Sequence, residues 1–286
     1  MILNGKVVAA SIREHLKEKV SKGVAEGLRA PCLVIFSVGD DPASKVYVRN
    51  KIKAGEEIGI EVKHIALPED AFEPRLISTI NYYNAIPWVN GIMVQLPLPE
   101  GFNERKIIDA IDPDKDVDGL TTINVGRLRS GQDCLLPCTA KGIMDILRYY
   151  DIPVCGADVA IVGRSNIVGK PLADLMMAAG ATVTQCHSKT HNLGYHLTGQ
   201  DIVVSAVGKP KFITGSMLTS GTVVIDVGIN RDENGKLCGD VDYEDVAPIA
   251  EAITPVPGGV GPMTVAELMA NVNRRRIQRE AYGECG

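Results

Sequence analysis

The chain has 286 residues, of which 45% are hydrophobic and 23% are charged, so its composition excludes extensive disorder and its length fits two domains. Its formal net charge of −5 argues against a nucleic-acid partner or an anionic membrane surface, because both require a basic excess. The sequence has no signal peptide at its start and no run of about 18 apolar residues, so we expect no membrane partner.

The first half of the chain alternates between helix-like and strand-like segments. Residues 6–28 have apolar side chains near helical spacing, Cys32–Val38 is typical of a buried strand, and Pro42–Ile58 of a helix with proline in its first turn. Four more segments continue the alternation: Glu61–Leu67, Glu73–Asn84, Gly91–Val94 and residues 103–111. This rhythm predicts βαβ units and a mainly parallel sheet.

A second α/β run follows a passage rich in proline and aspartate at residues 112–119 and a connecting helix at 139–150. Asn234-Gly235 predicts a hairpin turn, and Thr264 with Glu267 predicts a capping box that starts the last helix. We expect that helix to return to the first domain. The predicted strands of this run are residues 158–162, 181–186, 201–206 and 222–227.

The fold class predicted from these elements is α/β with two domains. Residues 1–140 plus 265–286 are expected to form a three-layer α/β domain, and residues 141–264 a Rossmann-like domain.

The seven cysteines are scattered and odd in number, and none has a partner at zinc-finger spacing. We expect free thiols, no metal site, and a reducing compartment such as the cytoplasm. The cysteines are Cys32, Cys134, Cys138, Cys155, Cys186, Cys238 and Cys285.

A glycine-rich turn at residues 163–171 joins a predicted strand to an apolar helix. Such turns aim backbone N–H groups at a pyrophosphate. The turn fits neither a P-loop, because Pro171 follows its lysine, nor GxGxxG, because Ser165 replaces the second glycine. A tight turn that only packs helix on strand is the alternative, but the βαβ context favours a nucleotide.

The strand after this helix ends without a carboxylate. NAD sites usually have an acidic residue there, which binds the ribose hydroxyl. This strand instead ends near His187 and Lys189, and together with Arg164 these side chains suit a 2′-phosphate. We therefore predict NADP rather than NAD; the alternative is that these three side chains are simply solvated.

Ser44, Tyr47 and Lys51 lie on one face of the helix predicted at Pro42–Ile58, because they are three and four residues apart. A helical lysine is ordinarily a solvated charge. Tyr-x-x-x-Lys also occurs in short-chain dehydrogenases, but in those enzymes the nucleotide loop comes before the motif, whereas here it comes after.

Asp114, Asp116 and Asp118 imitate the start of a calcium-binding loop. Val125 stands where that loop needs a glutamate, so calcium is not expected. The carboxylates serve either to cap a turn or to bind a heterocycle rich in N–H donors.

The chain contains a series of short motifs in a fixed order: Val38-Gly39, Ser44-x-x-Tyr47-x-x-x-Lys51, Val94-Gln95-Leu96-Pro97-Leu98-Pro99, Lys115-Asp116-Val117-Asp118-Gly119, Pro137-Cys138-Thr139, residues 163–171, Asp226-Val227-Gly228-Ile229-Asn230 and residues 254–264. Taken together, these motifs resemble those of the bifunctional methylenetetrahydrofolate dehydrogenase/methenyltetrahydrofolate cyclohydrolase family. Ala140 departs from the family, which usually has proline there.

The resemblance implies that Lys51 is the central catalytic residue, with Gln95 as its partner, Tyr47 stacking on the folate and Asp118 holding the pterin. It implies a folate site, NADP as cofactor and a homodimer. Further implied folate contacts are Ser44, Val94, Leu96, Pro257, Gly258, Gly259, Val260 and Gly261. Implied NADP contacts are Gly163, Arg164, Ser165, Ser188 and Ile229.

The implied chemistry is hydride transfer to NADP followed by hydrolysis of the methenyl product. Burial and the cationic product would both lower the pKa of Lys51, which favours the neutral amine that proton transfer requires. Two alternatives stay open: a monofunctional methylenetetrahydrofolate dehydrogenase, and a non-catalytic NADP-binding regulatory protein.

Overall fold

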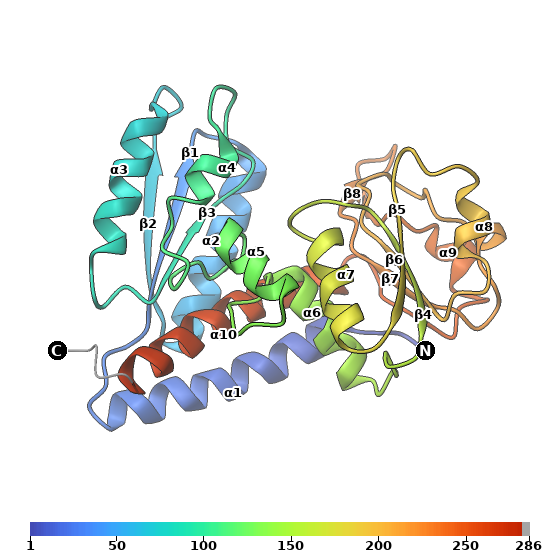
Figure 1. Cartoon of the computed structure of the whole chain (residues 1–286), viewed down its shortest axis with the longest axis horizontal. Coiled ribbons are helices and arrows are strands. Elements are labelled where there is room, and N and C mark those ends of the chain that lie inside the picture. The colour runs from blue at the N-terminus through green and yellow to red at the C-terminus, as the bar shows by residue number, and fades with distance from the viewer. Residues whose placement is uncertain (282–286) are drawn as a thin grey trace. The chain divides into compact units, whose positions relative to one another are not determined.

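The computed structural model describes residues 1–281, and the chain divides into two compact units. The three-stranded unit comprises Ser11–Cys138 and the chain from Val265 onward, and the five-stranded unit comprises Met1–Ala10 and Thr139–Thr264 (Figure 1). The sequence placed residues 1–10 in the first domain. The structure groups them with the five-stranded unit, where the N–H of Leu3 donates to the carbonyl of Ile253 at 2.8 Å.

The sheet of the three-stranded unit has the order β2-β1-β3, and its pairs are parallel. The strands are β1 (Cys32–Val38), β2 (Glu61–Leu67) and β3 (Gly91–Val94). The helices are α1 (Gly5–Ala25), α2 (Pro42–Ile58), α3 (Glu73–Asn84), α4 (Glu104–Ile108), α5 (Thr122–Arg129) and α10 (Val260–Ala281), of which the N-terminal ends of α1 and α10 belong to the other unit.

Helices cover both faces of this sheet, so β1 is buried along its whole length. Leu33 and Ile35 face a core that α1, α2 and α10 complete, whereas Val34 and Phe36 face the core beneath α3 and α4. Successive side chains of a strand point to opposite faces, and a strand buried on both faces is therefore continuously apolar. The predicted three-layer α/β domain is confirmed, and so is the return of the last helix, since Met269 of α10 lies in the first of these cores.

The five-stranded unit contains a parallel sheet of order β10-β7-β6-β4-β5 (Figure 1). This is the order of a doubly wound fold, and the chain reverses its winding direction between β4 and β6. The strands are β4 (Asp158–Val162), β5 (Thr182–Cys186), β6 (Ile202–Ser205), β7 (Val223–Asp226) and β10 (Ala252–Ile253). The predicted Rossmann-like domain is confirmed.

The connections of this unit include short helices and a hairpin. The hairpin pairs β8 (Asn230–Arg231) with β9 (Leu237–Cys238), as Asn234-Gly235 predicts, and Gly235 has φ 76°. The helical segments are α6 (Cys138–Tyr149), α7 (Gly169–Ala178), α8 (Leu193–Leu197), the 3-10 turn η1 (Gly215–Met217) and α9 (Tyr243–Val246).

The predicted capping box at the last helix is wrong. α10 begins at Val260, so Thr264 lies inside the helix rather than at its N-cap. The hydroxyl of Thr264 instead shares a 3.0 Å hydrogen bond with that of Thr139, and Glu267 is fully buried. Thr264 therefore makes a tertiary contact, and Glu267 is buried in the interior, instead of capping the helix.

The described cysteines are free: Cys32, Cys134, Cys138 and Cys186 are buried, and Cys155 and Cys238 are at least partly exposed. Cys285 lies outside the described residues. Within residues 1–281, no helix is both long and apolar enough to cross a membrane.

Candidate active site

Helix α2 presents the face predicted from the spacing of Ser44, Tyr47 and Lys51. The carboxylate of Asp41 caps this helix by accepting the N–H of Ser44 at 2.7 Å, and Pro42 occupies the first turn. Tyr47 is 43% exposed, so its ring is available to a ligand, whereas Ser44 and Lys51 are partly buried.

The amine of Lys51 donates to Oε1 of Gln95 at 2.9 Å. Gln95 directly follows β3, and its own N–H is bonded to the carbonyl of Phe36 at 2.8 Å, so the sheet fixes its backbone. Its Nε2 donates to the carbonyl of Leu96 at 2.7 Å. That bond orients the amide with its oxygen toward Lys51.

Burial lowers the pKa of Lys51, and the nearby Asp118 and Cys138 partly oppose the effect. Burial also raises the pKa of the Asp118 carboxyl, and the Lys51 amine partly opposes that effect. The two groups therefore share one poorly solvated environment. An amine in such surroundings loses its proton more readily than an exposed lysine, and its lone pair can then accept one.

The aspartates of residues 112–119 have different roles. Asp116 is buried and accepts hydrogen bonds from the N–H of Thr121 at 2.8 Å and from Asn124 at 2.9 Å, so it caps the next turn. Asp114 is exposed and pairs with Arg127 and Arg275. Of the two uses that the sequence left open, the contacts of Asp116 fit capping, whereas Asp118 lies beside Lys51.

Val94 and Leu96 flank Gln95 but differ in their surroundings. The side chain of Val94 packs in the apolar core with Phe36, whereas Leu96 is partly exposed and precedes Pro97 through a cis peptide bond.

The predicted loop at residues 257–261 lies in the five-stranded unit, after β10, and its last two residues form the start of α10. A cis peptide bond joins Val256 to Pro257. Pro257 and Gly261 are exposed, whereas Gly258, Gly259 and Val260 are buried. The carbonyl of Gly258 accepts the N–H of Lys6 at 3.1 Å, so the start of the chain holds this loop.

The turn after β4 brings the backbone close to its neighbours. Gly163 has φ 138°, and a Cβ there would lie 2.4 Å from the carbonyl oxygen of Ala206. A Cβ on Gly169 would lie 2.2 Å from the carbonyl oxygen of Gly163. The hydroxyl of Ser165 accepts the N–H groups of Val168 at 3.2 Å and Gly169 at 3.4 Å, just before and at the start of α7. Both glycines are therefore required for the close packing of this turn.

A cavity of about 440 Å³ opens at the carboxyl ends of β4, β5 and β6. Three of the residues predicted to contact the cofactor, Gly163, Arg164 and Ser188, line it, and so does His187. Ser165 and Ile229 do not line it, although both are exposed. Ligands of doubly wound folds bind at this position, where the winding direction changes.

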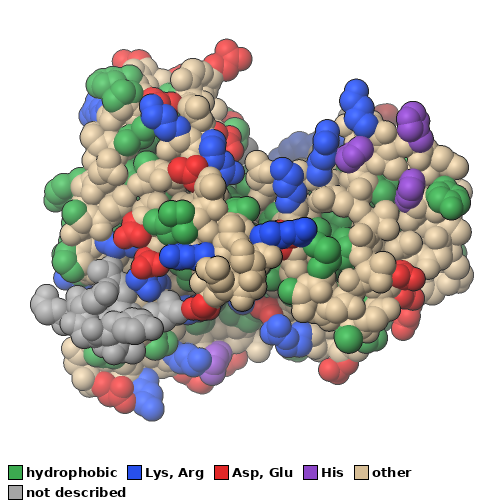
Figure 2. Space-filling model, viewed as in Figure 1, with side chains coloured by type: hydrophobic (Ala, Val, Ile, Leu, Met, Phe, Trp, Pro, Cys, Tyr) green, Lys and Arg blue, Asp and Glu red, His purple; other side chains and the backbone are tan. Residues whose placement is uncertain are grey.

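Among the lining residues that the sequence analysis missed are Lys209 and Phe212, which follow β6. The amine of Lys209 lies 5.5 Å from the centre of the Phe212 ring. In Figure 2, Lys, Arg and His side chains gather along the upper edge of the five-stranded unit. Because the chain as a whole is acidic, this local gathering of cations is where an anionic ligand would be attracted.

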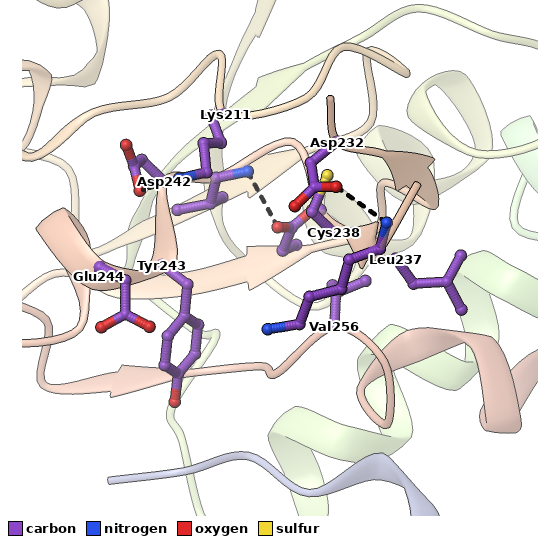
Figure 3. A pocket seen from close by; sticks show the side chains of 12 residues that line it. Lys211, Asp232, Leu237, Cys238, Asp242, Tyr243, Glu244 and Val256 are labelled. Carbon is purple, nitrogen blue, oxygen red and sulfur yellow. Dashed lines mark hydrogen bonds and ion pairs between the residues drawn. The ribbon is translucent and has the colours of Figure 1, made fainter. Parts of the chain in front are cut away.

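A second, smaller pocket of about 240 Å³ lies beside the β8–β9 hairpin (Figure 3). Its charged side chains are largely engaged within the pocket. Lys211 pairs with Asp242 at 3.5 Å, and Asp232 accepts the N–H of Lys236 at 2.8 Å. We assign no ligand to it.

Two family models match the chain. The model of the tetrahydrofolate dehydrogenase/cyclohydrolase catalytic domain matches residues 3–118, and the model of the tetrahydrofolate dehydrogenase/cyclohydrolase NAD(P)-binding domain matches residues 137–280. The chain belongs to the tetrahydrofolate dehydrogenase/cyclohydrolase family. The family predicted from the motifs is thereby confirmed.

Individual members of the family are similar over nearly their whole length. The bifunctional protein FolD of Streptococcus pneumoniae serotype 2 is 50% identical over 94% of each chain. The crystal structure of the bifunctional FolD enzyme of Campylobacter jejuni has a TM-score of 0.96 at 44% identity, covering 98% of this chain and 99% of that one. FolD of Trypanosoma brucei, complexed with NADP cofactor and inhibitor, has a TM-score of 0.92 at 35% identity and 98% coverage of both chains.

In this member of the family, Cys138 lies next to the candidate catalytic groups. It is fully buried at the start of α6, and its thiol donates to the carbonyl of Val117 at 3.3 Å. Burial, with Asp118 as the next cause, raises its pKa well above 9.0, so the thiol stays neutral. The Pro-Cys-Thr motif was the sequence signal for this position, but we assigned it no role.

Asn271 of α10 was missed altogether. Its Nδ2 donates to the carbonyl of Val117 at 2.8 Å and to that of Leu136 at 2.9 Å. It therefore fixes the residue before Asp118 from a helix 154 residues further along the chain. No local pattern could have shown this contact.

Among the described residues, no group of three or more His, Cys, Asp or Glu side chains could hold a metal ion.

Proposed function

We propose that the chain oxidises methylenetetrahydrofolate with NADP and then hydrolyses the methenyl product to formyltetrahydrofolate, two steps of one-carbon metabolism. The observation that carries the proposal is the hydrogen bond between Lys51 and Gln95, because it holds an amine of lowered pKa at a fixed position. Membership of the family and the bifunctional relatives support both activities.

The cavity of the five-stranded unit fits NADP. The glycine turn lets the backbone approach a pyrophosphate, and Arg164 and Lys209 supply positive charge for phosphates. Ser188 adds a hydroxyl donor, and we propose that Ser165 and Ile229 contact the cofactor from outside the cavity lining. When bound, NADP supplies the acceptor for the hydride that leaves the folate.

Asp118 and Tyr47 are proposed to bind the folate. A carboxylate can accept two parallel N–H bonds from a pterin, and burial makes such bonds stronger than they would be in water. The exposed ring of Tyr47 offers a flat surface for stacking. Ser44, Val94, Leu96 and residues 257–261 are proposed as further folate contacts.

Lys51 is the proposed proton carrier of the hydrolytic step. Water that attacks the methenyl carbon must lose a proton, and a neutral amine can accept it. Gln95 orients the amine without fixing its charge, because an amide is itself uncharged. Alignment of the folate is the main task of the same residues in the oxidation.

We further propose a homodimer in the cytoplasm, with no nucleic-acid or membrane partner. The family resemblance supports the dimer. The free thiols support a reducing compartment, and the net charge of −5 argues against a nucleic acid or an anionic membrane surface as a partner.

The test is purified protein mixed with methylenetetrahydrofolate and NADP, followed by absorbance. The proposal expects NADPH and the methenyl compound to form, and then the methenyl absorbance to decay faster than it does without protein. Methenyl that accumulates and decays only at the uncatalysed rate would indicate a monofunctional dehydrogenase. No NADPH formation, despite NADP binding, would indicate a non-catalytic binding protein.

A further inference from the structure

Asp240 is a fully buried carboxylate that follows β9 and lies outside the lining of the nucleotide cavity. Within the described residues, five donors converge on it. Its Oδ2 accepts the N–H of Val207 at 2.7 Å, the N–H of Gly208 at 3.3 Å and the hydroxyl of Ser205 at 3.3 Å. Its Oδ1 accepts the N–H of Lys209 and the side-chain amide of Asn230, both at 2.9 Å.

Three of these donors are consecutive backbone N–H groups of the turn at residues 207–209. That turn follows β6, and Val207 and Lys209 line the nucleotide cavity. The N–H of Lys211, after Pro210, donates to the carbonyl of Gly239 at 3.2 Å. Gly239 and Asp240 therefore accept hydrogen bonds from both ends of the segment at residues 207–211. The shape of one cavity wall therefore depends on Asp240.

A second carboxylate supports the first. Asp226, at the end of β7, accepts the N–H groups of Asp240 and Val241 at 2.9 Å. The packing leaves no room for side chains between them: a Cβ on Gly239 would lie 1.8 Å from the Asp226 carboxylate, and one on Gly228 would lie 2.2 Å from Oδ1 of Asp240. Asp240 is thus itself held rigidly.

We propose that Asp240 is a positioning residue for the nucleotide, which holds the turn at 207–209 in the conformation that NADP binding requires. The inference rests on the proposed function, because it takes the cavity as the NADP site. A carboxylate suits five donors because it only accepts hydrogen bonds. An amide in its place would turn an NH₂ group toward backbone N–H groups, so the turn would have to move.

The test compares Asp240→Asn with Asp201→Asn in the full chain. Asp201 also accepts a backbone N–H, that of Asp158 at 2.8 Å, but it lies at the amino end of β6, the end opposite the turn. By calorimetric titration with NADP, we expect affinity to fall about 10- to 100-fold in Asp240→Asn and by less than about twofold in Asp201→Asn.

Hydrolysis of methenyltetrahydrofolate, measured without NADP, separates positioning from a loss of folding. We expect that rate and the KM for folate to be unchanged in Asp240→Asn while the KM for NADP rises. If that variant does not fold, Ser205→Ala removes a single 3.3 Å bond to Asp240 and is expected to weaken NADP binding about two- to fivefold.

Unchanged NADP affinity in folded Asp240→Asn, or in Ser205→Ala where Asp240→Asn does not fold, would overturn the inference, and so would an equal loss in Asp201→Asn. In each of these cases the proposed function would stand. A wild-type chain that binds no NADP would instead overturn both.

Discussion

Lys51 and Gln95 lie 44 residues apart in the chain, yet their side chains meet at 2.9 Å. The partner of the amine is an amide, which accepts a hydrogen bond without carrying charge. A carboxylate in its place would stabilise the ammonium form, against the effect of burial. The neutrality of Gln95 is therefore part of what lets Lys51 exchange protons.

Changing the charge of this partner should change the pH dependence of hydrolysis. Gln95→Glu is expected to raise the pKa of Lys51, so the rise of cyclohydrolase turnover with pH should move to higher pH. Gln95→Leu removes the hydrogen bond without adding charge. It should therefore lower turnover about 10-fold, while the pH profile of turnover moves much less than in Gln95→Glu. Turnover is measured at saturating methenyltetrahydrofolate across pH, and identical profiles in the two variants would contradict the prediction.

Asp118→Asn should weaken folate binding by about 1–3 kcal/mol, because one buried group is left imperfectly paired. It also removes a negative charge that raises the pKa of Lys51. The rise of turnover with pH should therefore move to lower pH, in the direction opposite to that in Gln95→Glu. Folate affinity is measured by titration, with Asp114→Asn as the exposed control. Unaltered affinity would remove Asp118 from the folate site.

Periodicity was sufficient to predict most of the regular structure. The predicted bounds of β1, at Cys32–Val38, and of α2, at Pro42–Ile58, match the structure. β1 is a continuous run of buried, mostly apolar residues, whereas α2 has proline in its first turn and a glycine directly after its last residue. Helix α5 was missed, since only eight residues form it and few of them are apolar. At Thr264 the local capping signal failed because the chain already turns into the helix at Val260.

The site was predictable only in part from spacing. Arg164 and Ser188 follow the ends of the adjacent strands β4 and β5, so a parallel sheet brings them to one edge. The pairing of Lys51 with Gln95 came from the family resemblance, because no rule of local spacing joins a helix to a strand end. The supporting contacts of Asp240 depend on tertiary structure, which a single sequence does not reveal.

Arg164→Ala should reduce the preference for NADP over NAD, because an exposed guanidinium at the cavity can donate two parallel hydrogen bonds to a 2′-phosphate. We expect the ratio of kcat/KM for the two cofactors to fall about 10-fold or more. Lys170→Ala is the matched control, since Lys170 is an exposed cation at the start of α7 that bonds to Asn166 and does not line the cavity. Equal ratios in wild type and Arg164→Ala would exclude Arg164 from this role.

The lowered pKa of Lys51 should also be visible in stability. Between that lowered pKa and 10.5, the unfolded chain binds a proton at Lys51 that the folded chain releases. This contribution makes wild type more stable as pH rises through that window. Lys51→Met lacks this gain in stability with pH. The difference in the free energy of unfolding, variant minus wild type, should therefore become more negative as pH rises. Denaturant unfolding from pH 7 to 10 measures it, and a constant difference would contradict the lowered pKa.

The most direct measurement compares both activities in wild type and Lys51→Met. Hydrolysis needs the amine to accept a proton from the attacking water, whereas oxidation needs the residue mainly to align the folate. We therefore expect cyclohydrolase turnover to disappear while a measurable part of NADP-dependent oxidation survives in protein that still binds folate. Full cyclohydrolase turnover in Lys51→Met, or complete loss of both activities with folate and NADP still bound, would contradict the role assigned to Lys51.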